Sequence, residues 1–221
     1  MRTIIASLAL VSAPAMAAIY YDPAGDIATG NPNLDIVMAE VTHTDDSLTI
    51  SMTVANLDAD WGKYMLLIDT GIMGGDGTNP WGRDITYGDG IEVDFALGSW
   101  LDNGGGSTDL LFWSSMGGWD SGGYSAVQSI DWDNNTVSWT IDGGFLELIS
   151  SDEGYGGFEF DIFSTGGGDG DPAIDLMGGE GVQPGWGQGS TMTDMFTYTL
   201  PAPGALALLG LAGLCGRRRR R

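Results

Sequence analysis

Several stretches of this chain alternate apolar and polar residues with a period of two, which limits the available folds more than any other feature. The clearest is SLTISMTV, in which Leu48, Ile50, Met52 and Val54 alternate with serine and threonine. Successive side chains of a strand point to opposite faces of a sheet, so the pattern predicts a strand with one buried face. MFTYTL, at residues 195–200, has the same pattern.

Two further stretches place acidic residues between apolar ones. In IEVDFAL, at residues 91–97, Glu92 and Asp94 alternate with apolar side chains, and in FEFDIF, at residues 158–163, Glu159 and Asp161 do so. Each stretch predicts a strand whose carboxylates lie on the face away from the core, because water solvates them there.

Strand patterns recur along the middle of the chain, separated by clusters of Gly, Asn, Asp and Ser, whereas helix signals are scarce. The expected strands are 36–41, 48–54, 64–69, 91–97, 110–114, 125–132, 136–141, 158–163 and 196–200. They all lie within residues 18–200, which is enough chain for one domain with a sizeable core. The prediction is an all-β fold, an antiparallel β-sandwich of about nine strands with little helix.

Residues 1–17 have the three parts of a secretory signal peptide. Arg2 is followed by an apolar run over residues 4–11 and by an A-x-A pattern that ends at Ala17. The run is too short to span a bilayer as a stable helix. We expect cleavage after Ala17 and export of the rest of the chain; the alternative is that the run forms a buried N-terminal strand.

The chain ends in PAPGALALLGLAGLCGRRRRR, residues 201–221. The apolar part, residues 204–216, is shorter than the ~20 residues of a full transmembrane helix, and five arginines follow it. Arginines behind an apolar segment stay on the cytoplasmic side of a membrane. We therefore expect this tail to hold the end of an exported chain at the membrane, with an exposed junction at Pro201 and Pro203.

The order of prolines, apolar run and terminal arginines resembles the PEP-CTERM sorting signal of Gram-negative bacteria. This resemblance covers residues 201–221 and implies processing by an exosortase, with Pro201, Ala202 and Pro203 as the sorting motif. The family has Glu between the prolines, where this chain has Ala202, so the processing position is left open. The alternative is a plain membrane anchor. Cys215, the only cysteine, lies in this tail, so the body at residues 18–200 has no disulfide.

The charge of the chain excludes one class of partner. Against 30 Asp and Glu there are 8 Lys and Arg, and only Lys63 and Arg83 among these lie outside the two end segments. Nucleic-acid binders need basic side chains to displace phosphate counterions, so a nucleic-acid partner is not expected. An acidic surface repels anionic lipid and attracts cations such as calcium.

Short motifs follow one another through the body in a recognisable order. YYDPAGD is followed by LDIVMAEVTHTDDSLTISMTV, YMLLIDTG, GRDITYGDG, GSW, LLFWSSMGGW and GDPAIDLM. This order resembles the DOMON-like β-sandwiches related to family 9 carbohydrate-binding modules, over most of residues 18–200. The resemblance implies a β-sandwich that binds sugars, haem or no known ligand, frequently with calcium.

Sugar sites need exposed aromatic rings that pack against the apolar face of a pyranose. Four tryptophans lie in stretches rich in Gly and Asp rather than in clean strands: Trp61, Trp81, Trp119 and Trp186. Of these, Trp81 and Trp186 are the candidate ligand platform; the alternative is that they cap the ends of the sandwich. Three others fall in expected strands and are predicted core residues: Trp113, Trp132 and Trp139.

Two features resemble ligand sites, one for haem and one for calcium, but neither predicts such a site. His43 is the only histidine and no motif places a methionine ligand, so haem is not expected, and His43 is assigned to a solvated hairpin end. DWDNNTVSWTID, at residues 131–142, matches several ligand positions of an EF-hand loop. It has Thr136 where that loop requires Gly, and Asp142 where it requires Glu. A β-hairpin that turns at residues 133–135 explains the stretch better.

Two loops are rich in potential calcium ligands. DPAGD supplies Asp22 and Asp26, and STGGGDGDPAID supplies Asp169, Asp171 and Asp175 in a Gly-rich segment. Calcium takes several oxygen ligands from carboxylates and backbone carbonyls, which such loops can provide. These five aspartates are the candidate metal ligands; the alternative is a solvated acidic surface.

No Ser–His or Cys–His pair suggests nucleophilic catalysis. The favoured function is that of an exported surface or extracellular-matrix protein, a non-catalytic β-sandwich with a binding or structural role. One alternative is a carbohydrate-binding module with extracellular polysaccharide as its partner. A less favoured alternative is a glycoside hydrolase that uses two of the many carboxylates.

Overall fold

A computed structural model describes residues 17–44, 46–102, 106–151, 156–168, 170–179 and 181–200. The predicted signal peptide, apart from Ala17, lies outside these residues. So does the predicted tail at 201–221, with its motif Pro201–Ala202–Pro203. In the described part of the chain, no helix is long and apolar enough to cross a membrane.

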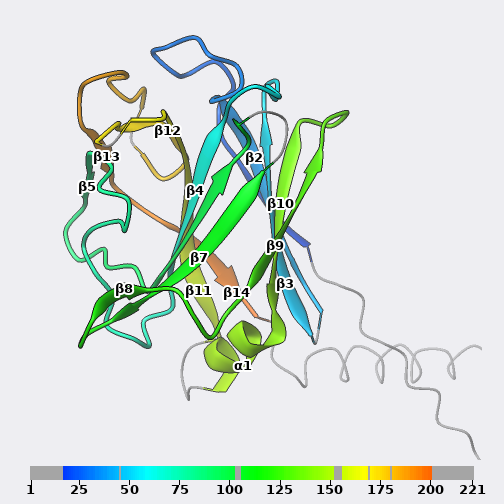
Figure 1. The fold of residues 1–221 in the computed structure, drawn as a ribbon, viewed down its shortest axis with the longest axis vertical. Coiled ribbons are helices and arrows are strands. Elements are labelled where there is room, and N and C mark those ends of the chain that lie inside the picture. Colours follow the sequence, from blue (N-terminus) through cyan, green and yellow to red (C-terminus); the bar gives the residue numbers. More distant parts are fainter. Residues whose placement is uncertain are drawn as a thin grey trace, which may run out of the picture.

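The first sheet has five strands, all antiparallel, in the order β1-β2-β3-β10-β9 (Figure 1). Their bounds are β1 Ala17–Tyr21, β2 Ile36–His43, β3 Ser47–Val54, β9 Ala126–Asp131 and β10 Thr136–Asp142. In β3 the apolar residues are buried and the Ser and Thr residues are half-buried, as the alternation predicts. Ile50 lies opposite Val41 on one side and Trp139 on the other, so the alternation sets one apolar face across the three central strands.

The second sheet has seven strands. Six follow the order β12-β11-β4-β6-β7-β8, and β14 also pairs with β11. Their bounds are β4 Lys63–Asp69, β6 Phe95–Trp100, β7 Ser107–Ser114, β8 Gly118–Asp120, β11 Gly157–Thr165, β12 Ala173–Leu176 and β14 Phe196–Thr199. Two short strands, β5 Ile85–Tyr87 and β13 Ser190–Met192, form a separate parallel pair.

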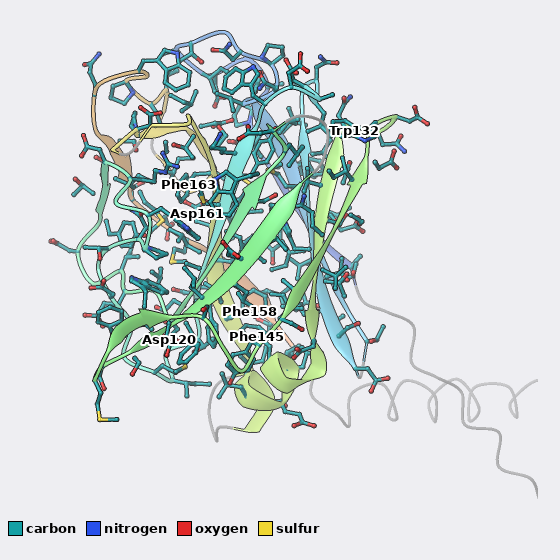
Figure 2. All side chains as sticks on the ribbon, viewed as in Figure 1. Asp120, Trp132, Phe145, Phe158, Asp161 and Phe163 are labelled. Carbon is teal, nitrogen blue, oxygen red and sulfur yellow. The ribbon has the colours of Figure 1, made fainter. Side chains whose placement is uncertain are left out.

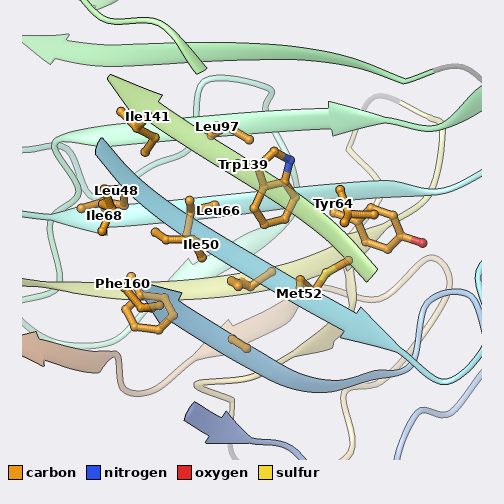
Figure 3. Close-up of a cluster of buried hydrophobic side chains, with 14 of the residues drawn as sticks. Leu48, Ile50, Met52, Tyr64, Leu66, Ile68, Leu97, Trp139, Ile141 and Phe160 are labelled. Carbon is orange, nitrogen blue, oxygen red and sulfur yellow. The ribbon is translucent and has the colours of Figure 1, made fainter. Parts of the chain in front are cut away.

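The main core fills the space between the two sheets, so the predicted all-β, sandwich-like architecture is confirmed. Figure 3 shows side chains of both sheets that meet there: Leu48, Ile50, Met52, Tyr64, Leu66, Ile68, Leu97, Trp139, Ile141 and Phe160. The helix α1, Gly143–Ser151, lies at one end of the core, where the Phe145 ring is 5.0 Å from that of Phe95 and 6.0 Å from that of Phe158 (Figure 2).

An additional layer covers the outer face of the second sheet. Residues 70–94, 177–179 and 181–195, called here the outer layer, include β5 and β13 and contribute a second apolar cluster. Ile85, Val93 and Met192 of this layer pack with Leu67 and Phe163 of the sheet. Strands β4, β6 and β12 and the second half of β11 are therefore buried on both faces, which an alternating sequence does not predict.

The outer layer overturns part of the sequence prediction for acidic residues. Glu159 is exposed as expected, whereas Asp161 and Asp94 are completely buried. Asp161 faces the outer layer, where one carboxylate oxygen accepts hydrogen bonds from the backbone N–H groups of Ile162 (2.8 Å) and Gly178 (2.9 Å). In IEVDFAL, the strand begins only at Phe95, because the preceding residues belong to the outer layer.

All nine expected strands have counterparts in the structure, but the number was too low. Five further strands are β1, β5, β8, β12 and β13, which are only three to five residues long and show no clear alternation in sequence. Of the three tryptophans predicted to be core residues, Trp139 is fully buried and Trp113 half-buried. Trp132 is 40% exposed because it follows the last residue of β9, in the turn.

The two ends of the described chain lie at the same end of the sandwich, called here the helix end because α1 is there (Figure 1). Ala17 pairs with Thr42 at the start of β1, and Thr199 pairs with Gly157 near the end of β14. The opposite end, called here the loop end, is formed by residues 22–35, 56–62, 166–168, 170–172 and 181–189.

Candidate functional site

Three of the predicted metal ligands meet at the loop end. Asp22 and Asp26 lie in the loop after β1, and Asp175 lies on β12. One carboxylate oxygen from each lies within 4.8 Å of the other two. The pairing of β12 with β11 fixes Asp175 opposite Ser164, and a backbone hydrogen bond from Asp22 to Val37 (3.1 Å) continues β1 into the cluster.

Backbone donors satisfy only part of this carboxylate cluster. Asp175 accepts hydrogen bonds from the N–H groups of Ile36 (2.6 Å) and Leu176 (2.8 Å). By contrast, one oxygen each of Asp22 and Asp26 is buried without a hydrogen-bond partner among the described residues. Buried acceptors without donors are costly, so an added cation would stabilise the cluster.

The electrostatics of the cluster agree with its geometry. Burial, followed by the charges of neighbouring aspartates, raises the pKa of Asp22 to about 7 and that of Asp175 to about 8. Burial also raises the pKa of Asp26, with a smaller contribution from Asp35. Carboxylate oxygens are the ligands that calcium prefers, and a bound cation would favour the ionised form of all three groups.

Asp35 is a member of this site that the sequence analysis missed. It is buried, and both of its carboxylate oxygens lie within hydrogen-bond distance of the N–H of Gly25 (2.9 and 3.1 Å), so it fixes the loop that carries Asp22 and Asp26. Its position directly before β2 is the only sequence signal that could have identified it.

Of the other two predicted ligands, Asp171 is not part of the cluster. Asp171 accepts a hydrogen bond from the N–H of Gly168 (2.7 Å) and so closes a turn within its own loop. Asp169 lies outside the described residues. The structure therefore brings together three of the five predicted ligands, Asp22, Asp26 and Asp175, and places Asp171 outside this cluster.

The two residues of the candidate ligand platform, Trp81 and Trp186, have different surroundings. Trp186 is 45% exposed at the loop end, and its ring centroid lies 6.5 Å from that of Trp61, with 39° between the ring planes. Trp81 is half-buried over the second sheet, where it packs edge-to-face on Trp100 at 6.0 Å. Trp61, which the sequence analysis did not select, is thus the aromatic partner of Trp186.

The loop at residues 22–35 connects the aspartate cluster to the tryptophan pair. A Cβ placed on Gly185, next to Trp186, would lie 3.4 Å from side-chain carbons of both Ala28 and Thr29. On the other side, the Asn33 side chain donates a hydrogen bond to the backbone carbonyl of Trp61 (3.2 Å). Residues 22–35 therefore contact the segments that carry both tryptophans.

A separate cavity of about 460 Å³ lies near the helix end. It is lined by ten residues: Asp69, Thr70, Gly71, Gly156, Gly157, Phe158, Glu159, Thr197, Tyr198 and Thr199. Asp69 and Glu159 are directly opposite each other on β4 and β11, and burial raises the pKa of Asp69. These two carboxylates are the pair that the glycoside hydrolase alternative would use.

Comparison with known proteins assigns no family to this chain. No protein-family model matches it, and no curated protein is significantly similar to it.

Proposed function

We propose that this chain is an exported, non-catalytic β-sandwich that is held at the cell envelope through its C-terminal tail and displays its loop end outward. In this proposal a signal peptide directs export, and an exosortase-type enzyme processes the PEP-CTERM-like tail. The observation that carries the proposal is the position of the chain ends: both are at the helix end, whereas the aspartate cluster and the tryptophan pair are at the loop end.

The length of the sandwich separates the two ends. β11 runs from Gly157, beside the C-terminal strand, to Thr165, which pairs with Lys63 near the loop end. Its nine residues span about 26 Å at ~3.3 Å per residue. A tail anchored at a membrane would therefore leave the loop end free to meet ligands outside the cell.

Calcium is the proposed cofactor of this displayed end. Asp22, Asp26 and Asp175 would supply its carboxylate ligands, and the ion would tie the loop after β1 to β12. Its role here is structural, because residues 22–35 also contact the segments that carry Trp61 and Trp186.

A second candidate function is carbohydrate binding at the loop end. The exposed Trp186 ring beside Trp61 favours it, since adjacent aromatic faces are suited to packing against pyranose rings.

Deletion of residues 204–221 tests the first proposal. We expect the parent chain in the envelope fraction and the truncated chain in the medium, because the truncated chain keeps the signal peptide but lacks the anchor. A variant with five lysines in place of Arg217–Arg221 is the control for charge, and it should remain in the envelope. Full-length, unprocessed protein in the cytoplasm would contradict the proposal.

A glycan array with the parent chain and Trp186→Ala tests the second candidate. Trp132→Ala is the matched control, because Trp132 is similarly exposed but lies in the β9–β10 turn and is not part of the Trp61–Trp186 pair. We expect binding that Trp186→Ala removes and Trp132→Ala leaves intact. Equal effects of the two substitutions would exclude a specific tryptophan site.

A further inference from the structure

The exposed charges around Trp61 and Trp186 are acidic. Asp58 and Asp60 belong to the turn that leads into Trp61, where the Asp58 carboxylate accepts a hydrogen bond from the N–H of Asp60 (2.8 Å). Asp60 is exposed and Asp58 is half-buried. These two residues lie one and three positions before Trp61 in the chain, in the turn at the loop end.

A third carboxylate flanks the pair on the side of Trp186. The point where a Cβ on Gly166 would lie is 2.6 Å from Cζ3 of Trp186 and closer still to a carboxylate oxygen of Asp171. The edge of the Trp186 ring and the Asp171 carboxylate therefore lie side by side over Gly166. They can do so because Gly166 has no side chain to occupy that position. A ligand on the exposed Trp186 ring would come close to that carboxylate.

The nearby basic groups do not offset these charges at the surface. Lys63 is mostly buried and forms an ion pair with Asp102, with Nζ and Oδ2 2.8 Å apart. Arg83 is buried and donates a hydrogen bond to the backbone carbonyl of Gly168. A ligand at the tryptophan pair would thus meet the half-buried Asp171 and, in the turn before Trp61, the exposed Asp60, while both bases are bonded beneath the surface.

Aromatic rings bordered by carboxylates favour a particular ligand chemistry. The face of a tryptophan ring attracts cations, by about 0.5–1 kcal/mol at exposed sites. Carboxylates add charge-assisted hydrogen bonds to an ammonium group. They repel uronic acids and sulfated sugars, which carry the opposite charge.

We infer that the Trp61–Trp186 site selects saccharides that carry a free amino group, such as polymers of glucosamine, over their neutral and acidic counterparts. This inference rests on the second candidate function, carbohydrate binding at the loop end. The sugar ring would pack on Trp186, and its ammonium group would lie near Asp171 or near the turn at Asp58 and Asp60.

The test measures binding of two hexamers with the same backbone, the hexamer of glucosamine and the hexamer of N-acetylglucosamine. Isothermal titration calorimetry with the full-length chain in a mild detergent is run at low and high sodium chloride concentration. We expect the amino hexamer to bind about fivefold more tightly at low salt, and high salt to reduce this preference. Hexamers of an uronic acid should not bind.

Variants separate specific recognition from general attraction to an acidic protein. Trp186→Ala should abolish binding of both hexamers, whereas Asp171→Asn and Asp60→Asn should reduce the preference and leave binding of the acetylated hexamer unchanged. Asp133→Asn, an exposed aspartate in the β9–β10 turn, is the control and should change neither.

The remaining outcomes separate failure of the selectivity from failure of carbohydrate binding itself. Equal or tighter binding of the acetylated hexamer overturns the selectivity and leaves carbohydrate binding standing. Binding of the amino hexamer that survives Trp186→Ala shows attraction to the acidic surface alone and overturns the inference. If neither hexamer nor any array glycan shows binding dependent on Trp186, both the inference and the carbohydrate-binding proposal fail.

Discussion

The carboxylates at the loop end act together because the fold places them together without matching donors. Burial raises the pKa of Asp22 and Asp175 to about 7 and 8, respectively. Two of the buried oxygens in the cluster have no hydrogen-bond partner among the described residues. Ionised carboxylates that are buried without hydrogen-bond donors oppose folding at neutral pH, and a bound cation would offset their charge.

We therefore predict that millimolar calcium raises the melting temperature by about 5–10 °C, the shift expected for ~2.7 kcal/mol at a hundredfold excess over Kd. Sodium chloride of equal ionic strength should give a smaller shift, since screening acts alike for any salt. Asp175→Asn should lose the calcium response, and Asp133→Asn should keep it. Equal shifts in the two salts, measured by differential scanning calorimetry, would leave the cluster as an ordinary acidic surface.

Asp161 gives a prediction that does not involve metal. Burial raises its pKa well above the usual range, and the charges of Asp22 and Asp194 raise it further. A raised pKa in the folded state means that stability present at low pH is lost as the pH rises above about 4, the value in the unfolded chain. The neutral Asp161→Asn variant keeps an acceptor for the Gly178 and Ile162 N–H groups.

We expect Asp161→Asn to be more stable than the parent at about pH 8 and nearly equal to it at about pH 4. Chemical denaturation across this pH range, in the presence of a chelator, measures the difference. Asp133→Asn is the control for loss of one negative charge at the surface. A constant difference between Asp161→Asn and the parent at all pH values would show that the pKa of Asp161 is the same in the folded and unfolded states, and would refute the prediction.

Among the elements, the long alternating strands were predictable and the short ones were not. In β3 and β10, alternation matches the buried and half-buried faces residue by residue. The hairpin at DWDNN is also confirmed, with Asn135 in the left-handed region at φ 55°. β12 could not be found by alternation, because all four of its residues are buried between layers.

The pairing of β11 with β14 depends on one glycine. Gly157 lies opposite Thr199, and a Cβ on Gly157 would overlap the backbone carbonyl oxygen of Tyr198. We predict that Gly157→Ala lowers stability by about 1–3 kcal/mol, because the two strands must separate to fit the methyl group. Gly117→Ala is the control, since its Cβ would meet no atom within 4 Å. Thermal unfolding measures both, and equal melting temperatures would refute the prediction.

At the scale of the molecule, the two sheets, their core and the outer layer all lie within the described residues up to 200. We therefore predict that residues 18–200 alone fold cooperatively, without the signal peptide or the tail. Far-UV circular dichroism should show mainly β-structure with one short helix, and thermal unfolding should be a single transition. A helical spectrum or a gradual transition would contradict this prediction. The full-length chain in detergent is the control.

The sequence by itself determined the local features of this protein: where the long strands run, which of their residues face the main core, and how acidic the surface is. These follow from alternation and composition, which act over a few neighbouring residues. Tertiary structure decided the rest. Asp175 bonds to the N–H of Ile36 across 139 positions of the chain, Trp186 meets Trp61, and the outer layer buries Asp161. Such contacts depend on which strands pair and which faces are covered, and the period of a single strand carries no information about either.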